Sequence, residues 1–245
     1  MSPDLKRLVP GAESASFTSM TARLLAALLA WSLLPAQVPL DQLKPVDRAL
    51  VEDVVRRADF VFETRTTPKR VRLQAMEKLF DHPRLGAAMW RQCHFVPTFY
   101  AFIHPDGSWS IDDTRGLRGA LTLLYHRPGL RVYYVEGRAE QGRLKTPFAV
   151  GAKMVTVYRY WDGPKGFESH LQTWTALDSA LLGFVARPFR GYIRQRQDEF
   201  IAYINGNIAT FGEFAAVDPR EFHGPLKREG DAVALRDFET LFLRR

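Results

Sequence analysis

The chain has 245 residues, of which 46% are apolar and 25% charged, so it is long enough to bury a substantial core in one globular domain with extensions. The net charge of +7 permits an anionic partner, but the basic residues are scattered and do not form the concentrated basic and aromatic surface of a nucleic-acid binder. Cys93 is the single cysteine, which excludes an intrachain disulfide framework and a thiolate zinc site.

Residues 1–36 are typical of a secretory signal peptide. Arg23 precedes an apolar run over residues 24–34, and Ala36 supplies the small residue expected at a cleavage site. The run is shorter than the about 20 residues that a transmembrane helix needs. We therefore expect export to a periplasmic or extracellular space, with Met20 as an alternative start of translation. An uncleaved membrane anchor and a buried amphipathic N-terminal helix are the alternatives.

The next segment contains a linker, three short helical stretches and a strand. Residues 37–58 hold two prolines and then apolar residues at helical spacing, which predicts a linker followed by a short helix. Residues 60–66 are rich in β-formers and predict the first strand. Two short helices are expected after it, one ending near Pro83 and one running through Trp90.

From Phe95 onward the hydrophobic period changes from about 3.6 to 2, which is the period of a strand. Short turns containing Gly or Pro separate six predicted strands, over residues 98–103, 108–114, 118–126, 130–140, 148–161 and 166–177. Consecutive strands joined by such turns form an antiparallel meander.

Residues 178–214 form the longest segment with a helical period in the chain. Pro188 either kinks this helix or marks the start of its main part. Since a sheet must bury its apolar face, the twisted sheet is expected to wrap around this helix. Residues 217–245 are predicted to be a C-terminal extension with a short helix that docks on the body.

This order of elements resembles the helix-grip fold of the START-like superfamily, which includes lipid-transfer domains, plant pathogenesis-related allergens and aromatic polyketide cyclases. The resemblance covers residues 59–216 and rests on the topology and on segments such as FVFETRTTPKRV and GAKMVTVYRYW. It implies an α+β fold in which a curved antiparallel sheet of about six or seven strands wraps around a long C-terminal helix, with two short helices after the first strand. It also implies a ligand-binding domain, in which an elongated cavity remains between sheet and helix.

Aromatic faces of the strands and of the helix are the expected walls of that cavity. They are Tyr100, Phe102, Trp109, Met154, Tyr158 and Tyr160 on the strands, and Phe189, Tyr192 and Ile193 on the helix. The alternative is that these side chains fill a solid core. Asp113 and Arg115 share a strand face and are candidates for holding a ligand's polar head, although they could equally pair with each other on an exposed rim.

Catalytic and cofactor motifs are absent from the sequence, which has no nucleophile elbow, phosphate-binding loop or dinucleotide fingerprint. The six histidines lack metal-site spacing, so no metal or cofactor is expected. His126 and His170 lie on predicted strands and could meet as a general base, or could simply lie at the surface.

The leading hypothesis is an exported, non-enzymatic carrier of a lipid or other apolar molecule. The alternatives are a cyclase- or hydrolase-type enzyme that uses the same cavity, and a binder of anionic membrane or nucleic-acid surfaces. A membrane surface is a candidate partner in the first case as well, whereas nucleic acid is not expected.

Overall fold

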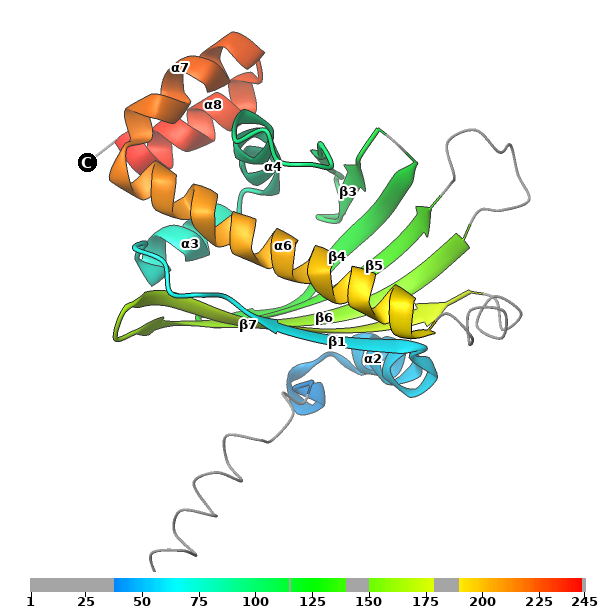
Figure 1. Cartoon of the computed structure of the whole chain (residues 1–245). Helices are drawn as coiled ribbons and strands as arrows, with labels where there is room; N and C mark the ends of the chain where they lie inside the picture. The colour runs from blue at the N-terminus through cyan, green and yellow to red at the C-terminus, as the bar shows by residue number, and fades with distance from the viewer. Residues whose placement is uncertain (1–37, 115, 140–149, 179–189, 244–245) are drawn as a thin grey trace, which may run out of the picture. The chain divides into compact units, whose positions relative to one another are not determined.

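The computed structural model of the chain describes residues 38–114, 116–139, 150–178 and 190–243 (Figure 1). These residues form a curved, unclosed antiparallel sheet with strand order β1-β7-β6-β5-β4-β3-β2. The strands are β1 (Phe60–Arg65), β2 (Tyr100–Ile103), β3 (Trp109–Asp112), β4 (Leu117–Arg127), β5 (Leu130–Ala139), β6 (Val150–Gly163) and β7 (Gly166–Leu177). The predicted meander is confirmed, because β2 to β7 are neighbours in chain order and β1 pairs with β7.

Helices lie on both faces of this sheet (Figure 1). They are η1 (Leu40–Gln42), α2 (Pro45–Arg57), α3 (Leu73–Phe80), α4 (Pro83–Gln92), α6 (Arg190–Val217), α7 (Pro219–Glu229), α8 (Ala232–Phe238) and η3 (Glu239–Leu243). The predicted α+β class, with two short helices after the first strand and a long helix after the last, is confirmed. No helix among these residues is long and apolar enough to cross a membrane.

The side chains of the sheet build two separate cores, because successive residues of a strand point to opposite faces. On the face turned toward α6, here called the inner face, Tyr158 and Phe167 pack with residues of α3, α4, α6, α7 and α8. On the opposite face, here called the outer face, Val155 and Val157 pack against α2. The predicted short helix before β1 therefore belongs to the outer core, and the long helix belongs to the inner core.

The C-terminal extension folds into two α-helices rather than one. Asp218 caps α7 by accepting a hydrogen bond from the backbone N–H of Arg220 at 3.2 Å, and Pro219 occupies the first turn, where its missing N–H costs nothing. Gly230, with φ of 81°, ends α7 in the left-handed conformation. The expected docking on the body is confirmed, since Phe238 is fully buried in the inner core.

Candidate functional site

The inner face of the sheet has a packed part and an open part. In the packed part Tyr158 and Tyr160 are 4% and 2% exposed, and both contact the ring of Phe80 edge-on, at 5.3 and 5.1 Å between centroids. Two of the residues expected to line a cavity, Tyr158 and Tyr160, thus lie in a solid core, which is the alternative reading of the aromatic pattern. The core residues of α3, α4, α7 and α8 are what fill this part of the face.

The open part of the inner face lies over β3, β4, β5 and the first half of β6. Its inward-facing side chains are only partly buried: Trp109, Ile111, Leu121, Leu123, Tyr133, Val135, Met154 and Thr156. The rings of Trp109 and Tyr133 contact each other at 6.2 Å between centroids. Burial raises the pKa of the Tyr133 phenol, partly offset by the charge of Arg131. None of these side chains carries a charge, so this surface suits an apolar molecule.

Two glycines lie side by side on this open surface. Gly119 of β4 and Gly137 of β5 are direct partners across the ladder, and Ala152 of β6 continues the row. A Cβ added at Gly119 or Gly137 would meet no atom closer than 3.4 and 3.5 Å, and neither residue has a positive φ. The backbone therefore does not require glycine here, although glycine weakens a strand. Its effect is to keep the space above the sheet free of side chains.

A buried ion cluster ties α3 to the inner face near the β4–β5 turn. Arg131 Nη2 donates to Asp81 Oδ1 at 2.7 Å and to Glu77 Oε2 at 3.0 Å, and Arg131 Nε donates to the Tyr160 hydroxyl at 3.0 Å. Burial raises the pKa of Glu77, but hydrogen bonds from the Gly129 N–H and from Arg131 outweigh it and hold that pKa below its ordinary value. Since Arg131 of β5 pairs with both Glu77 and Asp81 at α3, the first role of the cluster is to fix α3 on the sheet.

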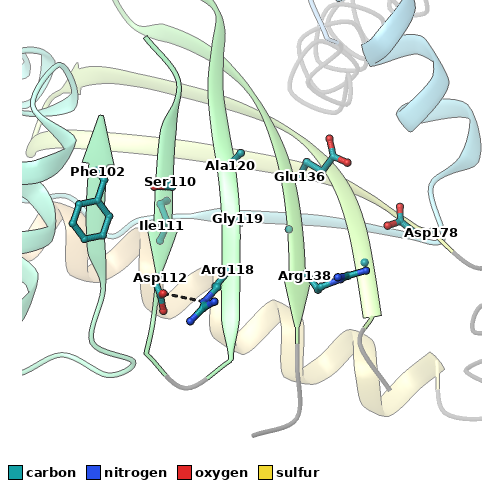
Figure 2. A pocket seen from close by; sticks show the side chains of 12 residues that line it. Phe102, Ser110, Ile111, Asp112, Arg118, Gly119, Ala120, Glu136, Arg138 and Asp178 are labelled. Carbon is teal, nitrogen blue, oxygen red and sulfur yellow. Dashed lines mark ion pairs between the residues drawn. The ribbon is translucent and has the colours of Figure 1, made fainter. Parts of the chain in front are cut away.

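A hollow of about 580 Å³ lies on the outer face, turned away from α6 (Figure 2). Its lining comprises Phe102, Ser110, Ile111, Asp112, Arg118, Gly119, Ala120, Glu136, Gly137, Arg138, Gly151 and Asp178. Arg118 Nε lies 3.0 Å from Asp112 Oδ2, and the Arg118 side chain is 73% exposed. The hollow is wide and open, and both signs of charge alternate along it. Water therefore reaches the whole hollow and screens its charges, so electrostatic interactions within it are weak.

The structure places several predicted site residues differently from the expectation. Cross-strand pairing sets Tyr100 and Phe102 on the outer face, where the Arg91 guanidinium covers the Tyr100 ring at 4.6 Å and Phe102 lines the hollow. The prediction that these two wall the space under the helix is therefore wrong. The period of two shows which residues share a face but not which face turns toward the helix.

Trp109 and Met154 do lie on the open inner surface, as expected. Phe189 lies outside the described residues, and so do the side chains of Tyr192 and Ile193 on α6.

Of the two expected polar head contacts, Asp113 and Arg115, the structure describes Asp113. Asp113 is buried at the end of β3 and does not line the hollow, and Arg115 lies outside the described residues. Next to Asp113 in the sequence, Asp112 forms an ion pair with Arg118.

His126 and His170 lie on opposite faces of the sheet, so they do not meet. His126 Nε2 is 3.2 Å from Arg131 Nη2 on the inner face, and His170 Nε2 is 2.7 Å from Glu63 Oε1 on the outer face. The predicted general-base pair is excluded by this register. Among the described residues no three His, Cys, Asp or Glu side chains are grouped so that they could hold a metal ion.

Comparison with known proteins adds little to this geometry. No protein-family model and no curated protein matches the chain. A solved structure of an uncharacterized protein from Rhizobium leguminosarum is 13% identical with a TM-score of 0.36, over 63% of this chain and 94% of that one. A likeness of this size supports no statement about function.

Proposed function

We propose that this chain is a START-like, non-enzymatic binding protein that holds a lipid or other apolar molecule between the inner face of its sheet and α6. The observation that carries the proposal is the open part of the inner face, where eight inward-facing uncharged side chains stay partly exposed. A sheet that needed only a core would bury them, as the same face does at Tyr158 and Tyr160.

Apolar contact alone is enough to hold such a ligand. Each CH₂ group removed from water contributes about 0.8 kcal/mol. Trp109 and Tyr133 add rigid aromatic area that costs little entropy to order. The paired glycines allow the ligand to approach the backbone of β4 and β5 closely, which is a recognised use of glycine inside a strand.

Among the described residues, no pair of titratable groups that an enzyme would need faces this space. The phenol of Tyr133 is the one inward-facing titratable group among the described residues of the open part, and its raised pKa keeps it protonated. Glu77, Asp81 and His126 are held in the ion cluster beside the packed part. A cyclase or hydrolase would need an acid and a base converging on its substrate.

The test fills the proposed space with a side chain. Gly137→Val would displace about two CH₂ groups of ligand, about 1.6 kcal/mol, and so weaken binding of 1-methylpyrene about fifteenfold in a fluorescence titration. The matched control is Ala120→Val, which adds similar bulk in the outer hollow and should leave the affinity unchanged. Protein purified under native conditions should also carry an apolar molecule that mass spectrometry detects.

The opposite effects of the two variants on affinity would place the ligand in the outer hollow. If Ala120→Val weakens binding and Gly137→Val does not, the ligand occupies the outer hollow and the proposal fails. Thermal unfolding of both variants checks that each is folded at the temperature of the titration.

Export of this carrier is part of the proposal, and it rests on the sequence because residues 1–37 lie outside the described residues. Expression of the full chain in a bacterium should yield a periplasmic product whose mass corresponds to cleavage after Ala36. Once exported, a carrier with a net charge of +7 is suited to exchange its ligand at an anionic membrane surface. Binding to anionic vesicles that does not weaken with salt would contradict this second point.

A further inference from the structure

A row of buried polar groups separates the packed part of the inner face from the open part. Ser169 Oγ of β7 donates to Asn205 Oδ1 of α6 at 3.0 Å. Tyr158 and Arg131 are direct partners across β5 and β6 and face the same way. Tyr158, Ser169 and Asn205 are each at most 4% exposed, and the Arg131 side chain is fully buried.

Three polar atoms of this row have no hydrogen-bond partner among the described residues: Arg131 Nη1, Tyr158 Oη and Asn205 Nδ2. The Ser169 hydroxyl is near enough to lower the Tyr158 pKa, although burial raises that pKa more and the two oxygens do not meet hydrogen-bond geometry. Buried polar groups in folded proteins are nearly always paired, and an unpaired one destabilises the fold. These three unpaired groups lie together at the inner end of an apolar surface. A polar atom of a ligand bound on that surface could therefore supply the missing hydrogen bonds.

The chemistry of the row defines that partner. Each of the three groups can donate a hydrogen bond, so the complementary group is an oxygen acceptor. The single positive charge of Arg131 already faces two carboxylates, Glu77 and Asp81. A third anion would meet a local excess of negative charge, whereas a neutral oxygen would not.

We propose that the ligand is an apolar molecule with a neutral oxygen, a hydroxyl or a carbonyl, at the end that reaches Tyr158 and Asn205. This inference rests on the proposed function and adds to it the chemical class of the ligand and its direction in the site. Since the three donors are covered in this structure, the oxygen reaches them only when α6 moves slightly away from β6 and β7.

Three probes that share one ring system test the inference: 1-methylpyrene, 1-pyrenemethanol and 1-pyrenecarboxylate. One neutral hydrogen bond contributes about 1 kcal/mol, so wild-type protein should bind the alcohol about fivefold more tightly than the hydrocarbon, with the carboxylate weakest. Tyr158→Phe should abolish most of the preference for the alcohol without lowering the melting temperature, because the hydroxyl has no partner to lose. Tyr134→Phe, on the outer face, is the matched control and should keep the preference.

Each other outcome is decisive. Equal binding of alcohol and hydrocarbon, tightest binding of the carboxylate, or an alcohol preference that survives Tyr158→Phe overturns this inference and leaves the apolar site standing. A melting temperature lowered by Tyr158→Phe shows that the hydroxyl is already bonded, which also overturns it. If none of the probes binds, the apolar site is absent and the proposed function fails as well. The relative affinities of the three probes for wild-type protein test the inference even if a variant does not fold.

Discussion

Replacement of Arg131 by methionine should destabilise the fold more than any change at an exposed ion pair. The Arg131 side chain is fully buried and donates to Glu77, Asp81 and Tyr160. Methionine replaces the aliphatic part of the side chain but removes the charge and every donor. Glu77 and Asp81, which lie on the α3 side of the contact, would then both lose the guanidinium that they share.

The magnitude follows from how far each partner reaches water. Breaking a buried ion pair costs about 3–5 kcal/mol. The Asp81 side chain is 54% exposed, so water can solvate its carboxylate after the substitution. The Glu77 side chain is 17% exposed, so water can solvate its carboxylate only in part. The lower end of the range, about 3 kcal/mol, is therefore expected, which for a chain of this size is about 6–12 °C in melting temperature.

The assay is thermal and denaturant unfolding followed by circular dichroism, with Arg118→Met as the control. Arg118 also pairs with a carboxylate at 3.0 Å, but its side chain is 73% exposed. A pair of that kind contributes about 0–1 kcal/mol. If the two variants lose the same stability, the ion cluster is not the tie between α3 and the sheet that its geometry indicates.

Acid should reduce the difference between wild type and Arg131→Met. The pKa of Glu77 lies below its ordinary value of 4.5 in the folded protein. A lowered carboxyl pKa stabilises the fold above the unfolded pKa, and that contribution is lost as the pH falls through the folded pKa. The variant lacks the Arg131 part of this contribution, so the two unfolding free energies should converge below about pH 4.5. A constant difference down to about pH 3 would contradict the assignment.

Two further predictions concern α6 and the cysteine. Gly206→Ala should stabilise the protein by up to about 1 kcal/mol, because an added Cβ meets nothing within 4 Å, whereas Gly212→Ala should destabilise it by overlapping Sδ of the fully buried Met76. Equal melting temperatures for the two would show that α6 does not pack as described. Burial raises the pKa of Cys93 to about 11, so its thiol should react slowly with a disulfide reagent near neutral pH and fast after unfolding. Fast reaction of the native protein would contradict that burial.

The sheet could be predicted from the sequence because its signals are local. Alternation of apolar residues marks each strand, and turns such as the one at Gly129, where φ is 79°, separate them. Strand β7 begins and ends at the predicted residues, 166 and 177. The C-terminal extension was harder to predict, since Gly224 and Pro225 look like helix breakers although α7 runs through both.

The site was only partly predictable, because its decisive contacts join residues far apart in the chain. Glu77 and Asp81, four apart, were detectable as one face of a helix, and Arg131 as a charge inside an apolar strand. Nothing local indicated that these three residues meet. The assignment of Phe102 failed for the same reason, since the choice of face depends on where α6 packs.

The C-terminal extension packs on the helices of the inner core. Phe222, Leu226 and Phe238 from α7 and α8 are buried in the inner core together with Trp90 of α4. Ion pairs join α4 to these helices, from Arg84 to Asp231 at 2.8 Å and from Arg91 to Glu229. Helices α7 and α8 pack beside α4 and the end of α6, as Figure 1 shows, and the partly exposed apolar surface lies on β3, β4, β5 and the first half of β6. Because the polar row lies at the inner border of that surface, the apolar ligand proposed above would end at this row.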